Sequence, residues 1–133
     1  MKYFLPLICS LILGSCNVIQ PQRAPLKLDG QRWTLTAINH KPISSDGKAF
    51  LEFEDNLDVK GKAFCNSISG GYELMGKDQL TFQELVSTKM FCDGVMNLEN
   101  EMMTNLQNVR RYEIKNGMLY LYGSDAVLLT FKK

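Results

Sequence analysis

Four cysteines and one histidine are the side chains of this 133-residue chain best suited to nucleophilic or metal chemistry. A cysteine nucleophile needs a base, and the single candidate is His40. No glycine-rich turn of the kind that presents a nucleophile surrounds Cys65 or Cys92. Zinc needs three or four ligands at regular spacing, whereas the sequence has neither a CxxC nor an HxxxH pair. We therefore predict a protein without catalytic residues, a metal site or a cofactor.

The methionines suggest a second metal hypothesis. The chain has seven of them, and Met96, Met102 and Met103 lie close together on a predicted helix. Thioether clusters can bind copper, but methionine more often fills gaps in a hydrophobic core. We interpret these three side chains as core packing.

Residues 1–15 have the pattern of a secretory signal peptide. One positive charge precedes an apolar run from Phe4 to Leu13, which the small pair Gly14-Ser15 separates from Cys16. The run is shorter than the roughly 20 residues that a transmembrane helix needs. The segment Leu13-Gly14-Ser15-Cys16 resembles a bacterial lipobox, in which the peptidase cuts before the cysteine and the new terminal cysteine carries the lipid. The alternative is an ordinary signal peptide with a chance cysteine.

Lipidation of Cys16 predicts where the protein resides. A triacylated cysteine anchors stably because more than one acyl chain enters the bilayer. By resemblance to bacterial sorting patterns, Asn17 favours the outer membrane, with the domain facing the periplasm. Residues 16–27 contain two prolines and little that could pack, and we interpret them as the lipidated N-terminus and a tether of at most about 35 Å.

The composition narrows the range of partners. Removal of residues 1–15 leaves 118 residues with 14 basic and 14 acidic side chains. A neutral chain has no long-range attraction to DNA or to anionic headgroups. We therefore expect the membrane to be contacted through the lipid, and we expect no nucleic-acid partner.

Two cysteines remain after this processing. Cys9 leaves with the signal peptide and Cys16 carries the lipid, so Cys65 and Cys92 stay in the folded domain. Export to an oxidising compartment favours a disulfide between them. Closing the intervening loop would stabilise the fold by roughly 3 to 4 kcal/mol in the chain-entropy model. A free nucleophilic thiol and a metal site remain the less favoured alternatives.

The rest of the chain must position these side chains, and its pattern of apolar residues predicts short strands and one helix. Apolar residues alternate with polar ones in eight segments, which is typical of half-buried strands. The pattern predicts an α+β fold with a strongly curved antiparallel sheet or a partly closed barrel, and one main α-helix. The predicted strands are residues 33–38, 49–53, 57–63, 70–74, 79–82, 112–114, 119–121 and 127–131.

The turn after Phe53 sets the register of the first hairpin. A three-residue turn pairs Phe53 with Leu57 and Leu51 with Val59, which keeps one face apolar. We therefore predict this register, with Asn56 in the left-handed conformation.

A later hairpin is predicted by the Asn116-Gly117 dipeptide, a strong signal for a two-residue turn. This turn pairs Ile114 with Leu119 and Tyr112 with Leu121, so the turn and the apolar pattern agree. On the other face of that strand, Tyr120 and Tyr122 form a candidate binding face or pocket mouth. The alternative is that both rings cover a small second cluster.

The helical stretch follows Asp93, which is predicted to be its N-cap. Its apolar residues recur at spacings of three and four, as in an amphipathic helix that covers a core. These residues are Val95, Leu98, Met102, Leu106 and Val109. The polar residues predicted to occupy the other faces are Asn97, Glu99, Asn100, Glu101 and Asn105.

Several of these segments resemble one family in type and order. The sequence from Gln31 to Phe131 is similar to the META domain, also named for the heat shock protein HslJ. The specific part is Cys-Asn after a strand with Thr-x-Met-x-Cys further on. The matching segments are Trp33-Thr34-Leu35, Gly61-Lys62-Ala63-Phe64-Cys65-Asn66, Gly71-Tyr72, Leu80-Thr81-Phe82, Thr88-Lys89-Met90-Phe91-Cys92, Glu99 and Leu106.

One position departs from the family pattern. The family usually has glycine immediately before Cys-Asn, whereas this chain has Phe64. Glycine takes backbone angles that phenylalanine avoids, so we expect a local difference in this turn. We interpret Asn66 as a turn residue that bonds nearby backbone, and Thr88 and Glu99 as structural polar contacts.

The resemblance implies a domain of curved antiparallel sheet and helix that is often found on bacterial lipoproteins. Members are linked to heat shock, drug tolerance, motility or secretion, and the family supplies no catalytic residues to transfer. We therefore expect a non-catalytic outer-membrane lipoprotein that supports envelope integrity or stress tolerance through an unidentified protein partner. The alternative is a binding module for an apolar ligand such as an acyl chain, which draws on a fold analogy to lipid-holding secretion proteins.

Overall fold

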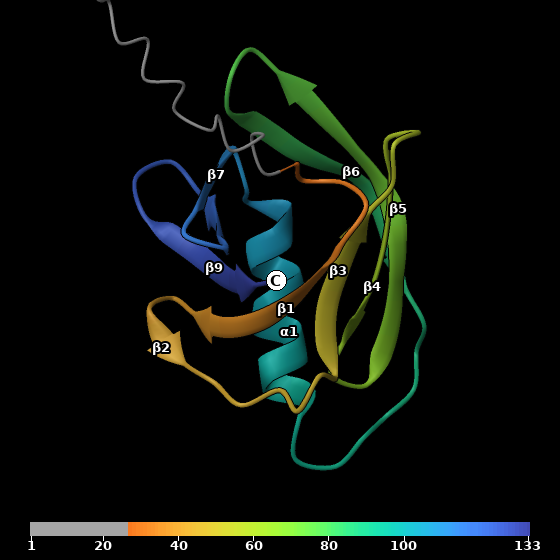
Figure 1. The fold of residues 1–133 in the computed structure, drawn as a ribbon. Helices are drawn as coiled ribbons and strands as arrows, with labels where there is room; N and C mark the ends of the chain where they lie inside the picture. Colours follow the sequence, from red (N-terminus) through yellow and green to blue (C-terminus); the bar gives the residue numbers. More distant parts are fainter. Residues whose placement is uncertain (1–26) are drawn as a thin grey trace, which may run out of the picture.

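The computed structural model describes residues 27–133, which form nine strands and one helix (Figure 1). The predicted signal peptide, Cys16 and the tether up to residue 26 lie outside these residues. The helix is α1 (Met96–Gln107). The strands are β1 (Arg32–Ile38), β2 (Lys41–Pro42), β3 (Ala49–Phe53), β4 (Asp58–Ala63), β5 (Asn66–Met75), β6 (Gln79–Ser87), β7 (Arg111–Lys115), β8 (Met118–Tyr122) and β9 (Val127–Lys132).

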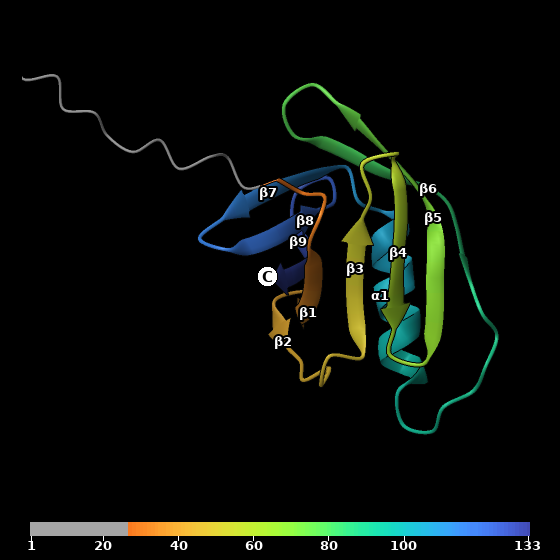
Figure 2. The same ribbon diagram turned by 45° about the vertical axis from the view of Figure 1, so that its right-hand side comes forward.

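The strands form one antiparallel sheet that closes into a ring. Strands β3 to β9 are neighbours in chain order, and β1 pairs with both β3 and β9. The ring is weakest between β6 and β7, which share the single pair Gln79 and Arg111. Helix α1 packs against β6, β9 and β4 on the inner side of the curved sheet (Figures 1 and 2). The predicted α+β architecture is confirmed.

The core is made by the inward-facing side chains of the strands together with the buried face of α1. Trp33 is completely buried, and its indole N–H donates a hydrogen bond of 2.8 Å to the carbonyl oxygen of Leu28. This bond fixes the start of the domain on the core. The other large side chains with almost no exposure are Leu35, Ile38, Leu51, Phe53, Leu80, Met102, Leu106, Leu119, Leu121, Leu129 and Phe131.

The first hairpin, β3–β4, differs from the prediction in register. Phe53 pairs with Val59, and Leu51 pairs with Gly61. The predicted pairing of Phe53 with Leu57 is therefore wrong by two residues. A shift of two leaves the same side chains on the buried face, so the apolar pattern could not distinguish the two registers.

The turn of this hairpin explains the shift. Leu57, and not Asn56, has the left-handed backbone, with φ of 68°. The side-chain oxygen of Asn56 instead accepts a hydrogen bond of 3.1 Å from the backbone N–H of Asp58. This Asx-type contact moves the turn one residue along the chain.

The second hairpin, β7–β8, confirms the prediction. Ile114 pairs with Leu119, and Tyr112 pairs with Leu121. Both residues of the Asn116-Gly117 turn have positive φ, 53° and 74°, as the two-residue turn requires.

The helix begins later than predicted. It covers Met96–Gln107 and follows Val95, and no side chain caps its N-terminus, so Asp93 is not the N-cap. Glu99 and Asn105 are buried, contrary to their predicted place on the polar faces. A helix with two buried polar residues needs partners for them, and the sheet provides these partners.

Substitution of Gly61 tests the close packing of β3 on β4. A Cβ atom at this position would lie 2.2 Å from the backbone oxygen of Phe50. We expect Gly61→Ala to destabilise the fold by about 2 to 3 kcal/mol through overpacking. Urea unfolding of the full chain measures the loss. The control is Gly71→Ala, where the added atom would have ordinary contacts of 3.5 Å or more, and equal losses in both variants would contradict the packing.

Candidate functional site

A buried carboxylate joins the helix to the sheet. Glu99, on α1, is only 5% exposed. Its Oε1 accepts hydrogen bonds from the backbone N–H groups of Cys65 at 3.3 Å and Asn66 at 2.7 Å. Its Oε2 accepts a bond of 2.7 Å from Nδ2 of Asn66. The carboxylate therefore binds the start of β5 with both oxygens, and these bonds offset the cost of its burial.

The side chain of Asn66 extends the connection to a third segment. Its Oδ1 accepts hydrogen bonds from the backbone N–H of Met90 at 2.7 Å and from the hydroxyl of Thr88 at 2.8 Å. Its Nδ2 also donates to the carbonyl oxygen of Met90 at 3.0 Å. The Thr88 hydroxyl oxygen accepts from the backbone N–H of Ser67 at 3.1 Å. We call Asn66, Thr88 and Glu99 the polar cluster; it joins β5, α1 and the segment of residues 88–92.

A disulfide reinforces the same junction. Cys65 and Cys92 are bonded, with their Cα atoms 5.7 Å apart, so the predicted pairing is present. Cys65 directly precedes Asn66, and Cys92 ends the segment that Asn66 holds. Neither cysteine is a free thiol, and neither can act as a nucleophile in this state.

Phe64, just before the disulfide, takes a left-handed backbone with φ of 62°. Phe64 therefore has a backbone conformation that glycine adopts more readily. Its side chain is 5% exposed and belongs to the hydrophobic core. Burial of the ring offsets the roughly 1 to 2 kcal/mol cost of this backbone conformation.

The polar cluster forms part of a groove between β6 and α1. The groove has a volume of about 550 Å³. One wall is the end of β6 and the segment after it, and the other wall is α1. The lining residues are Asn66, Leu85, Val86, Ser87, Thr88, Lys89, Met90, Met96, Glu99, Asn100, Met103 and Gln107.

Apolar side chains are exposed at this groove. Val86 and Met90 line it with exposures of 61% and 57%, and the adjacent Phe91 is 79% exposed. Beyond Gln79, strand β6 pairs only with β5, so its other edge has no strand partner within residues 27–133. Exposed apolar residues beside an open strand edge are typical of binding surfaces. The hydrogen-bonding groups of Asn66 and Glu99 are used internally, so they stabilise the groove.

The three helical methionines, all predicted to pack in the core, differ in burial. Met102 is buried in the core, as predicted, whereas Met96 and Met103 are half-buried and line the groove. His40 is exposed in the turn between β1 and β2. In residues 27–133, no group of three or more His, Cys, Asp or Glu side chains could hold a metal ion.

The candidate binding face at Tyr120 and Tyr122 consists of half-buried rings on β8. The Tyr122 hydroxyl donates a hydrogen bond of 3.0 Å to Glu113, and the guanidinium carbon of Arg111 lies 3.7 Å from its ring centroid. Partial burial and the bond to Glu113 raise the pKa of the Tyr122 phenol. These contacts stabilise the outer face of β7–β8, and a binding role for the two tyrosines stays a prediction.

Sequence reasoning missed the groove. Strand β6 was predicted to end at Phe82, but it continues to Ser87, and Leu85 and Val86 form part of the wall. The only sequence signal was the Met90-Phe91 pair between polar Lys89 and Cys92. An apolar pair outside any periodic segment can be a surface feature, but the pattern does not indicate where it lies.

The fold and the site together define a small α+β domain in which a closed antiparallel sheet holds one helix through a buried polar cluster and a disulfide. The model of the META domain family matches residues 25–133. The chain therefore belongs to the META domain family, as the sequence resemblance indicated. Among curated proteins, none matches the chain.

Three solved structures have a similar fold. An NMR structure with 27% identity covers 79% of this chain and 90% of its own, with a TM-score of 0.63. An NMR structure of a protein from Burkholderia xenovorans has 23% identity, covers 79% and 82%, and has a TM-score of 0.64. A crystal structure of a duf4847 family protein from Bacteroides vulgatus has 16% identity, covers 79% and 93%, and has a TM-score of 0.61. The last two comparisons show the fold alone.

Substitution of Glu99 tests the polar cluster. Gln keeps the size of Glu but loses the charge and one acceptor, so Glu99→Gln leaves at least one buried donor poorly paired. We expect a loss of about 1 to 3 kcal/mol in the free energy of unfolding, the usual cost of leaving a buried donor unpaired. Urea denaturation at pH 7 measures it.

The matched control is Glu101→Gln on the same helix. Glu101 is exposed and accepts one hydrogen bond of 2.9 Å, from Asn39. We expect a change below about 0.5 kcal/mol, as is usual for surface positions. A loss as large as that of the Glu99 variant would show that the cluster is not specifically stabilising.

Proposed function

We propose that this META domain is the periplasmic part of an outer-membrane lipoprotein that acts through protein contacts in envelope stress tolerance or integrity. The observation that supports contacts is the groove between β6 and α1, with Val86, Met90 and Phe91 exposed beside it. The lipobox at residues 13–16 supports the anchor. In residues 27–133, no helix is long and apolar enough to cross a membrane.

The groove suits an extended peptide segment. The free edge of β6 offers backbone hydrogen bonds to an added strand, a common mode of peptide recognition. Apolar side chains of that strand would contact Met96 and Met103 on the opposite wall. Methionine side chains are flexible and adapt to different partners, so the groove can accept a variety of apolar side chains.

An apolar ligand such as an acyl chain is the second candidate. Its supporting observation is the size of the groove, about 550 Å³, which lies in the usual range of about 300 to 1,000 Å³ for small-molecule sites. The described interior of the sheet is filled by Trp33, Phe131 and their neighbours. An acyl chain would therefore bind at the surface groove and not inside the ring.

Replacement of Cys16 tests the anchor. We expect Cys16→Ser to remove the lipid and to release the protein from the membrane fraction, because the apolar run before it is too short to span the bilayer. Fractionation of cells followed by immunoblotting measures the distribution. Cys9→Ser is the control and should remain in the membrane fraction. Membrane retention of the Cys16 variant would contradict lipid anchoring.

Two variants test the groove. A photoreactive residue at Asn100, on the α1 wall, should crosslink to a discrete envelope protein in intact cells. We expect Met90→Glu with Phe91→Glu to reduce this crosslink at least tenfold, because two charges would replace apolar contact surface. The matched control is Leu74→Glu with Met75→Glu, two exposed apolar residues at the β5–β6 turn, and it should crosslink normally.

The same variants separate the two candidates. Native mass spectrometry of the purified chain would detect a bound lipid, which the Met90 and Phe91 variant should lose if the groove holds an acyl chain. A crosslink without a lipid supports protein contacts. Equal crosslinking of both variants would exclude the groove as the contact surface.

A further inference from the structure

The outer surface of the sheet opposite α1 has an aromatic ring among basic side chains. Phe50 on β3 pairs with Lys62 on β4 and with Thr34 on β1. Thr34 in turn pairs with Lys132 on β9. The guanidinium carbon of Arg32 lies 3.9 Å from the ring centroid of Phe50. Four adjacent strands therefore contribute to one row of cationic, small and aromatic side chains.

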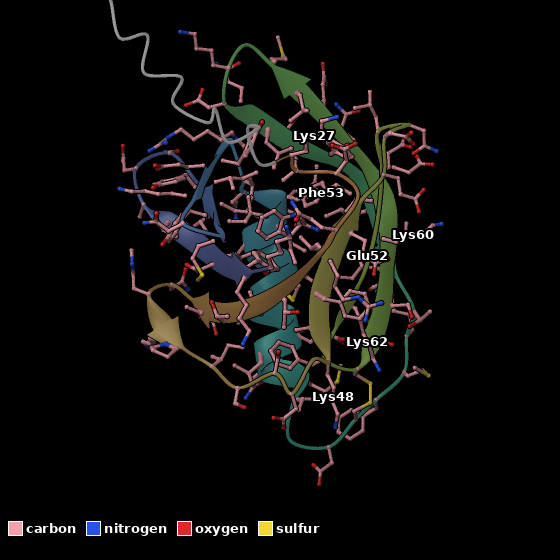
Figure 3. The ribbon with its side chains drawn as sticks, in the orientation of Figure 1. Lys27, Lys48, Glu52, Phe53, Lys60 and Lys62 are labelled. Atoms are coloured by element: carbon pink, nitrogen blue, oxygen red, sulfur yellow. A yellow bond between two sulfur atoms is a disulfide. The ribbon has the colours of Figure 1, made fainter. Side chains whose placement is uncertain are left out.

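Lys48 extends this row at the start of β3. Ala49 is buried, so the alternation of side chains places Lys48 and Phe50 on the outer side. Figure 3 shows Lys48 and Lys62 extending from the same side of β3 and β4. We call Lys48, Phe50, Lys62 and Lys132 the basic face.

Two carboxylates near the basic face are in ion pairs, whereas Asp46, which lines a hollow together with Thr34 and Lys132, accepts a hydrogen bond from the Ser44 hydroxyl. Glu52 contacts Arg32 at 2.6 Å, and Glu54 contacts Lys60 at 2.8 Å. These are the ion pairs in the described part of the chain, and neither involves Lys48, Lys62 or Lys132. The three lysines of the basic face outnumber the one nearby carboxylate that is in no ion pair, Asp46, so the face has a cationic excess that can bind an external anion.

The basic face contrasts with the charge of the whole domain. Of the 15 basic residues, Lys2 and Arg23 precede residue 27, whereas all 14 acidic residues follow it. Residues 27–133 therefore have a slight negative excess. Because the net charge is slightly negative, an excess of cations on one face leaves an acidic excess on the other faces of the domain. A negatively charged membrane would therefore attract the basic face and repel the other faces.

We propose that the basic face lies on anionic lipid headgroups of the membrane that holds Cys16. Lysine ammonium groups bind headgroup phosphates, and a half-buried aromatic ring suits the interface. This attraction acts only within about 10 Å at 0.1 M salt, so it needs the domain to be held close. The proposal rests on the proposed function for that tethering.

The tether keeps the face within reach of the bilayer. The described chain starts at Lys27, 11 residues after Cys16, so a lipid on Cys16 lies at most about 36 Å from it. Tethering gives a high effective concentration, and a weak attraction is then sufficient to orient the domain. Helix α1 lies on the inner side of β3 and β4 (Figure 2), so this orientation leaves the groove facing the periplasm.

Lysine footprinting of the full chain reconstituted in vesicles tests the orientation. Vesicles of phosphatidylethanolamine and phosphatidylglycerol at 3:1 are compared with phosphatidylcholine, using a membrane-impermeant acylating reagent at 0.1 M salt. We expect Lys48, Lys62 and Lys132 to react at least threefold more slowly in the anionic vesicles. Lys77 in the β5–β6 turn and Lys89, which lines the groove beside α1, serve as internal controls and should react equally in both.

Three further conditions complete the test. Salt at 0.5 M should abolish the protection, and 10 mM inorganic phosphate without anionic lipid should not produce it. Lys48→Glu with Lys62→Glu should abolish the protection of Lys132, whereas Lys77→Glu with Lys89→Glu should preserve it. Equal reactivity in both vesicle types would overturn the proposal, and so would protection in both types at high salt, which would indicate contact between copies.

This experiment is separate from the test of the anchor. The chain is reconstituted into vesicles, so the footprint does not depend on where the cell places the protein. A lipid-anchored protein with no footprint would leave the proposed function intact and remove only the orientation. If the footprint is observed but the Cys16 variant stays in the membrane fraction, the orientation is supported and the lipid anchor is contradicted.

Discussion

The buried carboxylate of Glu99 is the interaction on which the rest of the structure depends. It holds α1 against the start of β5 through three hydrogen bonds. Asn66 is in turn hydrogen-bonded to the segment of residues 88–92. A charged group in an apolar interior is costly unless it is fully paired. The helix can therefore pack in one orientation, in which the carboxylate meets these donors. The disulfide between Cys65 and Cys92 covalently links the start of β5 to the segment of residues 88–92.

This junction has consequences for the surface. The sheet ring is nearly open between β6 and β7. The polar cluster joins α1 to the start of β5 and to residues 88–92, and α1 and the end of β6 form the groove at this junction. Asn66, Thr88 and Glu99, which belong to the family motif, thus stabilise the groove through hydrogen bonds within the domain. The most exposed apolar side chain, Phe91, lies between two residues of this junction, Met90 and Cys92.

Much of the fold could be predicted from the sequence, and the failures have identifiable causes. The β7–β8 hairpin was predicted correctly because Asn116-Gly117 and the apolar alternation required the same register. In the β3–β4 hairpin, two registers keep the same face buried, and the side chain of Asn56 decided between them. Helical periodicity places Glu99 on a polar face because it treats every carboxylate as solvent-exposed, whereas the family resemblance led to its interpretation as a structural polar contact, which is confirmed. Its partners lie more than thirty residues away in the chain, where no local pattern includes them.

The sequence by itself determined the class of fold, the pairing of Cys65 with Cys92 and the family, because these depend on local periodicity, on counting and on a motif. It also predicts the lipid anchor from four adjacent residues. Only the tertiary structure decided how charge is distributed and where apolar surface remains open. A nearly neutral chain concentrates cations around Phe50, and β6 leaves an edge free beside α1. Both features arise from strands distant in sequence becoming neighbours, and composition and spacing do not contain that information.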